Sequence, residues 1–293
     1  MPDKRLPRWR SMLFMPAHEA RFVERAHLRR ADAIILDLED SVAPASKAAA
    51  RERLPKHVAL LAERGLEVIV RVNRDLSNCV ADLTAATMEG VSAIMLPKVR
   101  GPDHVALVDE FLIEKEQERD LSPGSIKLIN LIETPAALNV MAPIAAASDR
   151  VVALAIGTED FSAECGFAPT FDNLFVPCQQ FIFACRAARV LALGLPGSIA
   201  SFEDADDFQL LASQAKAMGF DGALCVHPRQ VEIVNVVFRP SAADVEFAAR
   251  VVEAYNEALR SGRGATSVGG VMVDEPVAKR AQALLATLKK SDA

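Results

Sequence analysis

The stretch Ala33-Ile34-Ile35-Leu36-Asp37-Leu38-Glu39-Asp40 joins a continuous apolar run to three acidic residues. An unbroken apolar run of this length predicts a parallel strand that is buried on both faces. Carboxylates at the end of such a strand are costly to bury unless a cation meets them. Two further apolar runs repeat the pattern, 128–132 before Glu133 and 151–156 before Asp160. The repetition indicates a divalent metal site on one rim of a parallel sheet.

Composition and charge favour a globular protein that acts on small molecules. Of the 293 residues 51% are hydrophobic and 25% are charged, which is typical of a soluble α/β domain. The formal charge of 33 − 39 = −6 disfavours a general nucleic-acid binder. Residues 1–30 nevertheless carry eight basic groups against three acidic ones. A basic start on an acidic protein suits a phosphorylated small molecule, but from charge alone a solvated face is the favoured interpretation.

Cysteine usage and apolar run lengths bear on the compartment. The chain has five cysteines, an odd number, with no Cys-x-x-Cys pair. This pattern indicates reduced core thiols in a cytosolic protein. No apolar run approaches the ~18 residues that a membrane helix needs, and the apolar stretch 12–15 is too short for a signal peptide. We therefore expect a cytoplasmic protein.

Short apolar runs alternate with long helical segments through residue 238. We predict strands at 11–15, 33–37, 68–72, 92–96, 127–132, 151–157, 195–199 and 222–226. We predict helices between them at 17–30, 46–64, 104–119, 136–147, 172–193 and 205–218. This alternation predicts a (β/α)8 TIM barrel over residues 1–238. The competing doubly wound sheet binds nucleotides through a glycine-rich first turn, and the first turn here, 15–18, contains no glycine.

Residues 239–293 form a C-terminal extension. A helix is expected at 242–261, then a Gly/Ser-rich link at 261–267, an apolar segment at 270–276 and a last helix at 277–289. The extension is too small to fold alone. We expect this helical extension to pack on the barrel or on a neighbouring subunit.

In TIM barrels the working residues follow the C-terminal ends of the strands. The polar residues at those positions are Asp37, Glu39, Asp40, Arg71, Asn73, Lys98, Glu133, Glu159, Asp160 and His227. Glu133 and Asp160 are on adjacent strand ends, and hard oxygen ligands favour Mg²⁺. The other acids are then expected to orient metal-bound water. The alternative for each acid is that it caps the following helix.

Three basic residues on this rim have competing interpretations. Arg71 directly follows an apolar run and is suited to bind a substrate carboxylate or a developing oxyanion; a structural ion pair with Asp37 or Glu39 is the alternative. Lys98 is expected to pair with the acids rather than to form a Schiff base, because an acidic rim keeps its amine charged. His227 is interpreted as a hydrogen-bonded structural residue.

The motifs, taken in order, resemble the citrate lyase β-subunit family, the CoA-ester lyase branch of the HpcH/HpaI aldolases. They cover nearly the whole chain and are Arg10-Ser11-x-Leu13-Phe14-x-Pro16, Ile35-Leu36-Asp37-Leu38-Glu39-Asp40-Ser41-Val42, Arg71-Val72-Asn73, Leu96-Pro97-Lys98, Ile132-Glu133-Thr134, Gly157-Thr158-Glu159-Asp160, Cys225-Val226-His227-Pro228 and Met272-Val273-Asp274-x-Pro276.

The resemblance implies a Mg²⁺-dependent carbon–carbon lyase. Its substrate would be a 3-hydroxyacyl-CoA such as malyl-, citramalyl- or citryl-CoA, and its products an acyl-CoA, usually acetyl-CoA, and a 2-oxo acid. Glu133 and Asp160 match the family's Mg²⁺ ligands, and Arg71 matches its substrate arginine. Asp274 matches an acid that relatives supply from a neighbouring subunit of a homotrimer.

The resemblance also assigns supporting roles and leaves alternatives open. The basic residues Arg10, Arg21 and Arg25 would face the CoA phosphates, while Asp37 and Glu39 would orient metal-bound water or the arginine. One alternative is a metal-dependent aldolase of pyruvate or another free oxo acid, which in relatives relies on a histidine near the position of His18. Another is a citrate lyase β subunit that is active only within a complex, and thioester hydrolysis after condensation is a variant on the same site.

Overall fold

The structure is a computed structural model that describes residues 6–200 and 203–289. Lys4 and Arg5 of the basic start lie outside the described residues. The chain divides into two compact units, Met1–Phe238 and Arg239–Ala293. None of the helices within the described ranges is long and apolar enough to span a bilayer.

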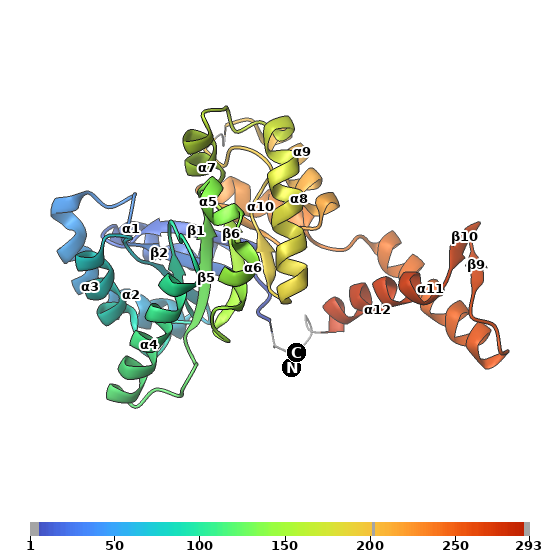
Figure 1. Cartoon of the computed structure of the whole chain (residues 1–293), viewed down its shortest axis with the longest axis horizontal. Helices are drawn as coiled ribbons and strands as arrows, with labels where there is room; N and C mark the ends of the chain where they lie inside the picture. Colours follow the sequence, from blue (N-terminus) through green and yellow to red (C-terminus); the bar gives the residue numbers. More distant parts are fainter. Residues whose placement is uncertain (1–5, 201–202, 290–293) are drawn as a thin grey trace. The chain divides into compact units, whose positions relative to one another are not determined.

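The first unit is an eight-stranded parallel barrel, as predicted (Figure 1). Its strands are β1 (Ser11–Pro16), β2 (Ala33–Asp37), β3 (Glu67–Arg71), β4 (Ala93–Leu96), β5 (Lys127–Ile132), β6 (Val151–Ile156), β7 (Leu191–Leu193) and β8 (Ala223–Cys225). They pair in the order β7-β6-β5-β4-β3-β2-β1-β8. A parallel bridge between Leu193 and Gly222 joins the two edges of this order, so the strands nearly close into a barrel.

Helices follow most strands and cover the outside of the sheet (Figure 1). They are α1 (Ala20–Val23), η1 (Ala26–Arg29), η2 (Pro44–Ser46), α2 (Lys47–Glu63), α3 (Leu76–Ala86), α4 (Pro102–Glu118), α5 (Pro135–Leu138), α6 (Met141–Ala146), α7 (Thr158–Cys165), α8 (Phe171–Ala188), α9 (Ala205–Met218) and α10 (Pro228–Val237). The sequence reading missed α3, α7 and α10, and it merged α5 with α6.

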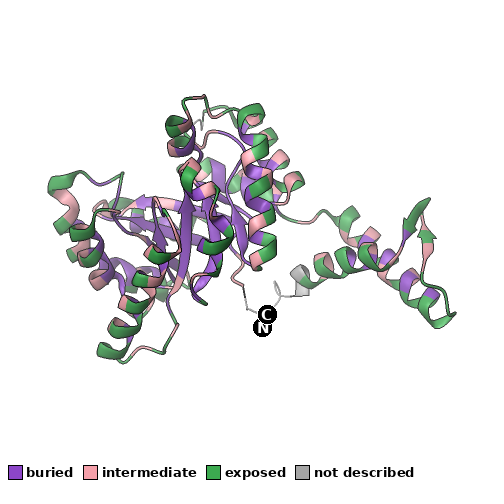
Figure 2. Ribbon diagram, in the orientation of Figure 1, coloured by how far each residue is buried: buried purple, intermediate pink, exposed green. Residues whose placement is uncertain are grey.

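The strands are buried on both faces, which explains why they read as continuous apolar runs (Figure 2). Successive side chains of a strand point to opposite faces, and the buried apolar residues accordingly fall into two clusters. One contains alternate strand residues such as Ile35, Ile69, Ile129 and Ala155 and fills the barrel interior. The other contains the residues between them and packs against the helices.

The prediction of the seventh strand was wrong. The strand occupies Leu191–Leu193 rather than 195–199, and the preceding helix ends at Ala188 rather than at 193. Leu and Ala are good helix formers, so the composition of this segment does not indicate where the helix stops. It stops because Arg189 adopts the left-handed conformation at the C-cap. The predicted strand segment instead follows Gly194, whose φ of 140° ends the strand.

The second unit, described by itself, consists of two helices and a hairpin. Its elements are α11 (Ala242–Arg260), β9 (Thr266–Val268), β10 (Val271–Val273) and α12 (Glu275–Lys289). A small cluster that includes Val251, Tyr255 and Val273 holds them together. The apolar segment expected at 270–276 therefore contains the second strand of the β9–β10 antiparallel hairpin. Packing of this unit on the barrel or on a neighbouring subunit stays a prediction.

Candidate active site at the barrel rim

Strand alternation aims three of the predicted site residues into the barrel mouth. Asp37 ends β2 two residues after the inward-facing Ile35, and Arg71 ends β3 two residues after Ile69. Glu133 likewise continues the inward series of β5. Because the strands are parallel, all three lie at the same C-terminal end. The fold thus brings together residues that are up to 96 positions apart in the sequence.

Asp37 and Arg71 form a buried, bidentate ion pair. Nε and Nη2 of Arg71 donate to the two carboxylate oxygens of Asp37 at 2.7 and 2.8 Å. Asp37 also accepts from the backbone N–H groups of Glu39 and Ser41 and from the Ser41 hydroxyl. Burial alone would raise the pKa of Asp37, but the Arg71 hydrogen bonds and charge outweigh it and hold that pKa below its usual value. Arg71 is therefore held rigidly, with its guanidinium 4.6 Å from the ring of Phe14.

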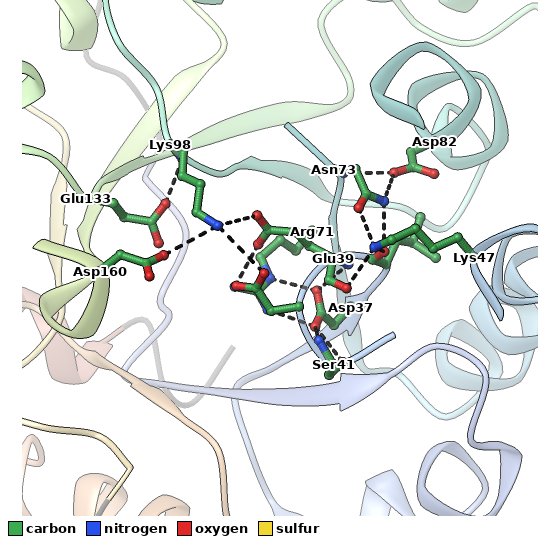
Figure 3. Close-up of polar contacts among 12 residues, drawn as sticks. Asp37, Glu39, Ser41, Lys47, Arg71, Asn73, Asp82, Lys98, Glu133 and Asp160 are labelled. Atoms are coloured by element: carbon green, nitrogen blue, oxygen red, sulfur yellow. Dashed lines mark hydrogen bonds and ion pairs between the residues drawn. The ribbon is translucent and has the colours of Figure 1, made fainter. Parts of the chain in front are cut away.

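Lys98 connects the two predicted metal ligands (Figure 3). Its backbone N–H donates to Glu133 Oε2 at 2.6 Å, and its ammonium lies 3.5 Å from Asp160 Oδ2. The same ammonium lies 3.1 Å from Glu39 Oε1 and 3.6 Å from Asp40 Oδ1. Burial lowers the pKa of Lys98, but Glu39 and the other acids raise it more strongly. These ion pairs confirm the predicted charge-pairing role of Lys98, and the raised pKa disfavours a Schiff-base nucleophile.

Glu133 is a buried carboxylate that lacks full compensation. Burial, with the nearby charges of Glu39 and Asp160, raises the pKa of Glu133 to about 7. Gly157 provides the space for it, because a Cβ at that position would lie 2.5 Å from both Cγ and Oε1 of Glu133. Asp160 lies in the first turn of α7, with a side chain that is 47% exposed. Glu133 and Asp160 line one pocket of about 170 Å³, together with Arg71.

The rim has more acidic than basic side chains, and this excess would be neutralised by a divalent cation. Its five carboxylates surround two fixed cations; the members are Asp37, Glu39, Asp40, Glu133, Asp160, Arg71 and Lys98. Glu39 Oε2 is buried and accepts no hydrogen bond within the described residues, although Nη1 of Arg71 lies 3.1 Å away. Burial also raises the pKa of Glu39. An excess of hard oxygen donors over fixed cations fits Mg²⁺.

The carboxylates do not form a complete metal cage by themselves. Within residues 6–200 and 203–289, no group of three or more His, Cys, Asp or Glu side chains is arranged to hold a metal ion. Glu133 and Asp160 are a pair, and Mg²⁺ commonly takes one or two carboxylates and completes its shell with water and substrate oxygens. The geometry therefore suits a metal that is shared with a substrate.

A polar network below the rim was not found from the sequence. The ammonium of Lys47 donates to the backbone carbonyls of Leu38 and Glu39 at 3.0 and 2.9 Å and to Oδ1 of Asn73 at 2.5 Å. Asn73 in turn donates to Leu38 and to the fully buried Asp82 (Figure 3). These bonds fix the loop that carries Glu39. The one sequence signal for this contact is that Lys47 begins α2, the first long helix after the acidic segment 37–40.

A second pocket of about 570 Å³ adjoins the first. It lies at the C-terminal ends of β1 and β8, and Phe14 lines both pockets. Two arginines line it together with Phe22, His227 and Glu232: Arg29, one of the basic residues of the start of the chain, and Arg229, which the sequence did not indicate. Basic groups beside an apolar wall suit a ligand that has both phosphates and an apolar arm.

The three arginines predicted to face CoA phosphates lie in different places. Arg21 and Arg25 are exposed on the segment that follows β1, and Arg21 pairs with Glu19 at 3.0 Å. Arg10 precedes β1 and forms a bidentate pair with Asp32, which precedes β2. These two residues are at the N-terminal end of the barrel, opposite the rim. The predicted contact of Arg10 with CoA does not fit this structure, and Arg10 has a structural role instead.

His227 and Asp274 both cap helices. Nδ1 of His227 accepts from the backbone N–H of Arg229 at the start of α10, which supports its interpretation as a structural residue. Asp274 belongs to the second unit, where Oδ1 accepts from the backbone N–H of Val277 at the start of α12. Entry of Asp274 into a neighbouring subunit's site stays a prediction.

A nearly closed parallel barrel with acids, an arginine and a lysine at its C-terminal rim places the chain in the class of TIM-barrel enzymes. Residues 10–228 match the family model described as HpcH/HpaI aldolase/citrate lyase. The chain belongs to this family, and the prediction that it is a lyase is confirmed at that level.

Similar proteins cover almost the whole chain. Citrate lyase subunit beta of Haemophilus influenzae is 34% identical over 96% of this chain and 97% of its own length. A (3S)-malyl-CoA thioesterase of Cereibacter sphaeroides is 36% identical over 91% of this chain and 90% of its own length. The solved structure of CitE from Mycobacterium tuberculosis in complex with magnesium, acetoacetate and coenzyme A is 32% identical, with a TM-score of 0.74 over 95% of this chain and 97% of that chain.

Proposed function

We propose that the protein is a Mg²⁺-dependent carbon–carbon lyase that cleaves or forms a 3-hydroxyacyl-CoA. Malyl-, citramalyl- and citryl-CoA are the substrates of this class, and the products are acetyl-CoA or another acyl-CoA and a 2-oxo acid. The observation that carries the proposal is the pair of adjoining pockets that share Phe14. The small acidic pocket suits the short oxo-acid end, and the larger pocket suits the CoA arm.

The larger pocket supports CoA binding on chemical grounds. Its apolar wall includes Phe14 and Phe22, and Arg29 and Arg229 are placed to pair with phosphates. Arg21 and Arg25 are exposed on the segment that carries Phe22 and extend the same positive surface. The relative CitE, whose solved structure contains magnesium, acetoacetate and coenzyme A, supports both ligands for this chain.

Glu133 and Asp160 are the residues that would hold Mg²⁺. Both line the smaller pocket, both contact Lys98, and the charge of Asp160 contributes, after burial, to the raised pKa of Glu133. When bound, Mg²⁺ supplies Lewis acidity to the hydroxyl and carbonyl oxygens of the substrate. Because the pKa of Glu133 is about 7, proton loss from this carboxyl accompanies loading of the site near neutral pH.

The protein's own residues then orient the substrate and move its proton. Arg71, held by Asp37 and Glu39, is aimed into the small pocket and binds the carboxylate of the oxo-acid portion. A fixed guanidinium also stabilises negative charge on oxygen without reorganising. Cleavage of the carbon–carbon bond leaves its electron pair on a thioester enolate, and we assign Asp274 of a neighbouring subunit in a homotrimer as the acid that protonates the methylene carbon of this enolate to give the methyl group of acetyl-CoA. In the direction of condensation the same carboxylate removes that proton.

The proposal is tested with the purified chain alone. We expect malyl-, citramalyl- or citryl-CoA to be converted to an acyl-CoA and a 2-oxo acid with Mg²⁺, and chelation with EDTA to stop turnover. Asp160→Asn should abolish the Mg²⁺-dependent reaction while the protein stays folded, because the side chain is half exposed. Asp172→Asn is the matched control, an exposed first-turn acid on α8 that does not line the pocket. Unchanged turnover in Asp160→Asn would remove that residue from the metal site.

The same assay separates the alternatives. Thioester hydrolysis, which the relationship to a (3S)-malyl-CoA thioesterase favours, would release free CoA in place of the acyl-CoA and oxo acid. A chain that is inactive alone but active with partner subunits would act as citrate lyase subunit beta does by name, as one component of a larger enzyme. Cleavage of a free hydroxy acid without CoA would leave the larger pocket without a ligand and overturn the proposal.

A further inference from the structure

Lys98 has a backbone conformation that its position in the fold does not explain. Within the described ranges four residues other than glycine have a positive φ: Arg30, Lys98, Asp120 and Arg189. Arg30 and Arg189 are helix C-caps and Asp120 follows the end of α4, where a left-handed residue is routine. Lys98 instead follows a strand, with φ 50°. Strained backbone that persists outside a helix cap is characteristic of functional sites.

The left-handed conformation gives Lys98 two contacts at once. Its backbone N–H is directed at Glu133 Oε2, 2.6 Å away. Its side chain leaves in the direction of Asp160 Oδ2 and Glu39 Oε1, 3.5 and 3.1 Å from the ammonium (Figure 3). The residue therefore touches both proposed metal ligands, one through the backbone and one through the side chain.

We infer that the ammonium of Lys98 is a built-in counter-ion that competes with Mg²⁺ for Asp160, while its backbone N–H holds Glu133 in place. This inference rests on the proposed function. Without a metal the ammonium partly neutralises Asp160, Glu39 and Asp40. When a divalent cation occupies Asp160, the ammonium retains Glu39 and Asp40, and the two cations repel each other across the pocket. Lys98 thereby lowers the affinity for Mg²⁺ and stabilises the metal-free protein.

The test separates the charge from the backbone. Lys98→Met removes the ammonium but keeps the length of the side chain and its backbone preference. We expect this variant to bind Mg²⁺ about tenfold more tightly, the size of a charge repulsion at several ångström in a partly exposed site. Its melting temperature without Mg²⁺ should fall below that of the wild type, and added Mg²⁺ should raise it by a larger amount.

Two further variants complete the design. Lys98→Gly also removes the ammonium but accepts positive φ without strain, so it should bind Mg²⁺ at least as tightly as Lys98→Met. Lys127→Met is the matched control, because Lys127 begins β5 at the end of the barrel opposite the rim, where its ammonium donates to the Gly124 carbonyl. The Mg²⁺ affinity of this variant should equal that of the wild type.

Isothermal titration with MgCl2 and thermal melting with and without Mg²⁺ give the readouts, and neither requires turnover. Mg²⁺ affinity that is unchanged or weaker in both Lys98→Met and Lys98→Gly overturns this inference and leaves the proposed function standing. A wild-type protein that binds no Mg²⁺ overturns the proposed function, and the inference falls with it.

Discussion

Gly157→Ala tests whether the position of Glu133 controls the site. Gly157 continues the inward-facing series of β6, where the missing side chain leaves space for Glu133. An added Cβ would lie 2.5 Å from Cγ and Oε1 and 2.9 Å from Cδ of Glu133. The backbone at Gly157, with φ −94° and ψ 89°, does not require glycine. The substitution therefore perturbs the site by volume and not by backbone strain.

The size of the effect follows from the distances. Ordinary carbon–carbon contact needs ~3.5 Å, so either Glu133 or the backbone at 157 must move by about 1 Å. Glu133 has little freedom to retreat, because it is buried and held at 2.6 Å by the N–H of Lys98. A displacement of this size in a catalytic group costs on the order of 10²-fold in rate. Overpacking should lower the free energy of unfolding by only about 1–3 kcal/mol.

The assay measures Mg²⁺ affinity, kcat/KM and urea unfolding side by side. We expect Gly157→Ala to lose about 10²-fold in kcat/KM or Mg²⁺ affinity while it remains folded. Gly101→Ala is the control, since its φ of −178° is ordinary extended backbone and nothing lies within 4 Å of an added Cβ. A Gly157→Ala protein with the Mg²⁺ affinity and kcat/KM of the control would refute the assigned position of Glu133.

Other substitutions separate stability from activity. Arg150→Met should lower the free energy of unfolding by about 3–5 kcal/mol, because it leaves Glu116 buried without the two hydrogen bonds of 2.6 and 2.7 Å that Arg150 donates. The value of kcat should not change, since Arg150 precedes β6 at the N-terminal end of the barrel. A large loss of kcat would contradict this expectation. Asp37→Asn should cost about 3 kcal/mol by removing the bidentate charged partner of the buried Arg71, which then keeps only Glu39 at 3.1 Å and the more distant Asp40, and should also lower kcat/KM. Burial lowers the pKa of His104 from the usual ~6.5 to about 4. The contribution of the neutral imidazole to the free energy of unfolding is therefore complete above pH ~6.5 and is lost as the pH falls toward 4, because the unfolded chain binds the proton first. His104→Gln should flatten the pH dependence of urea unfolding in that window, and an identical profile would contradict the assignment.

The barrel was predictable because its strands have one composition throughout. Parallel strands covered on both sides are apolar at most of their positions, and this made seven of the eight visible in the sequence. The seventh failed for a local reason. Leu191-Ala192-Leu193 suits a helix and a strand equally well, and the helix before it stops at a left-handed arginine instead of a glycine.

The site was predictable where position along a strand determines the direction of a side chain. Asp37, Arg71 and Glu133 follow from the alternation of their strands. The same reasoning would have placed Arg10 at the wrong end of the barrel for a CoA contact, because it precedes its strand. The charge pairing of Lys98 was predicted, but its backbone contact with Glu133 was not, because that contact depends on a left-handed backbone. Lys47 and Arg229 were beyond reach, because their positions depend on contacts between distant segments.

The central claim is that Glu133 and Asp160 together hold one divalent ion. Titration with Mn²⁺, followed by electron paramagnetic resonance of the free ion, measures this directly on the wild type, Glu133→Gln and Asp160→Asn. The account predicts one Mn²⁺ per chain in the wild type, displaced by Mg²⁺, and a loss of about 10²-fold in affinity in each variant. Wild-type affinity in either variant would contradict it.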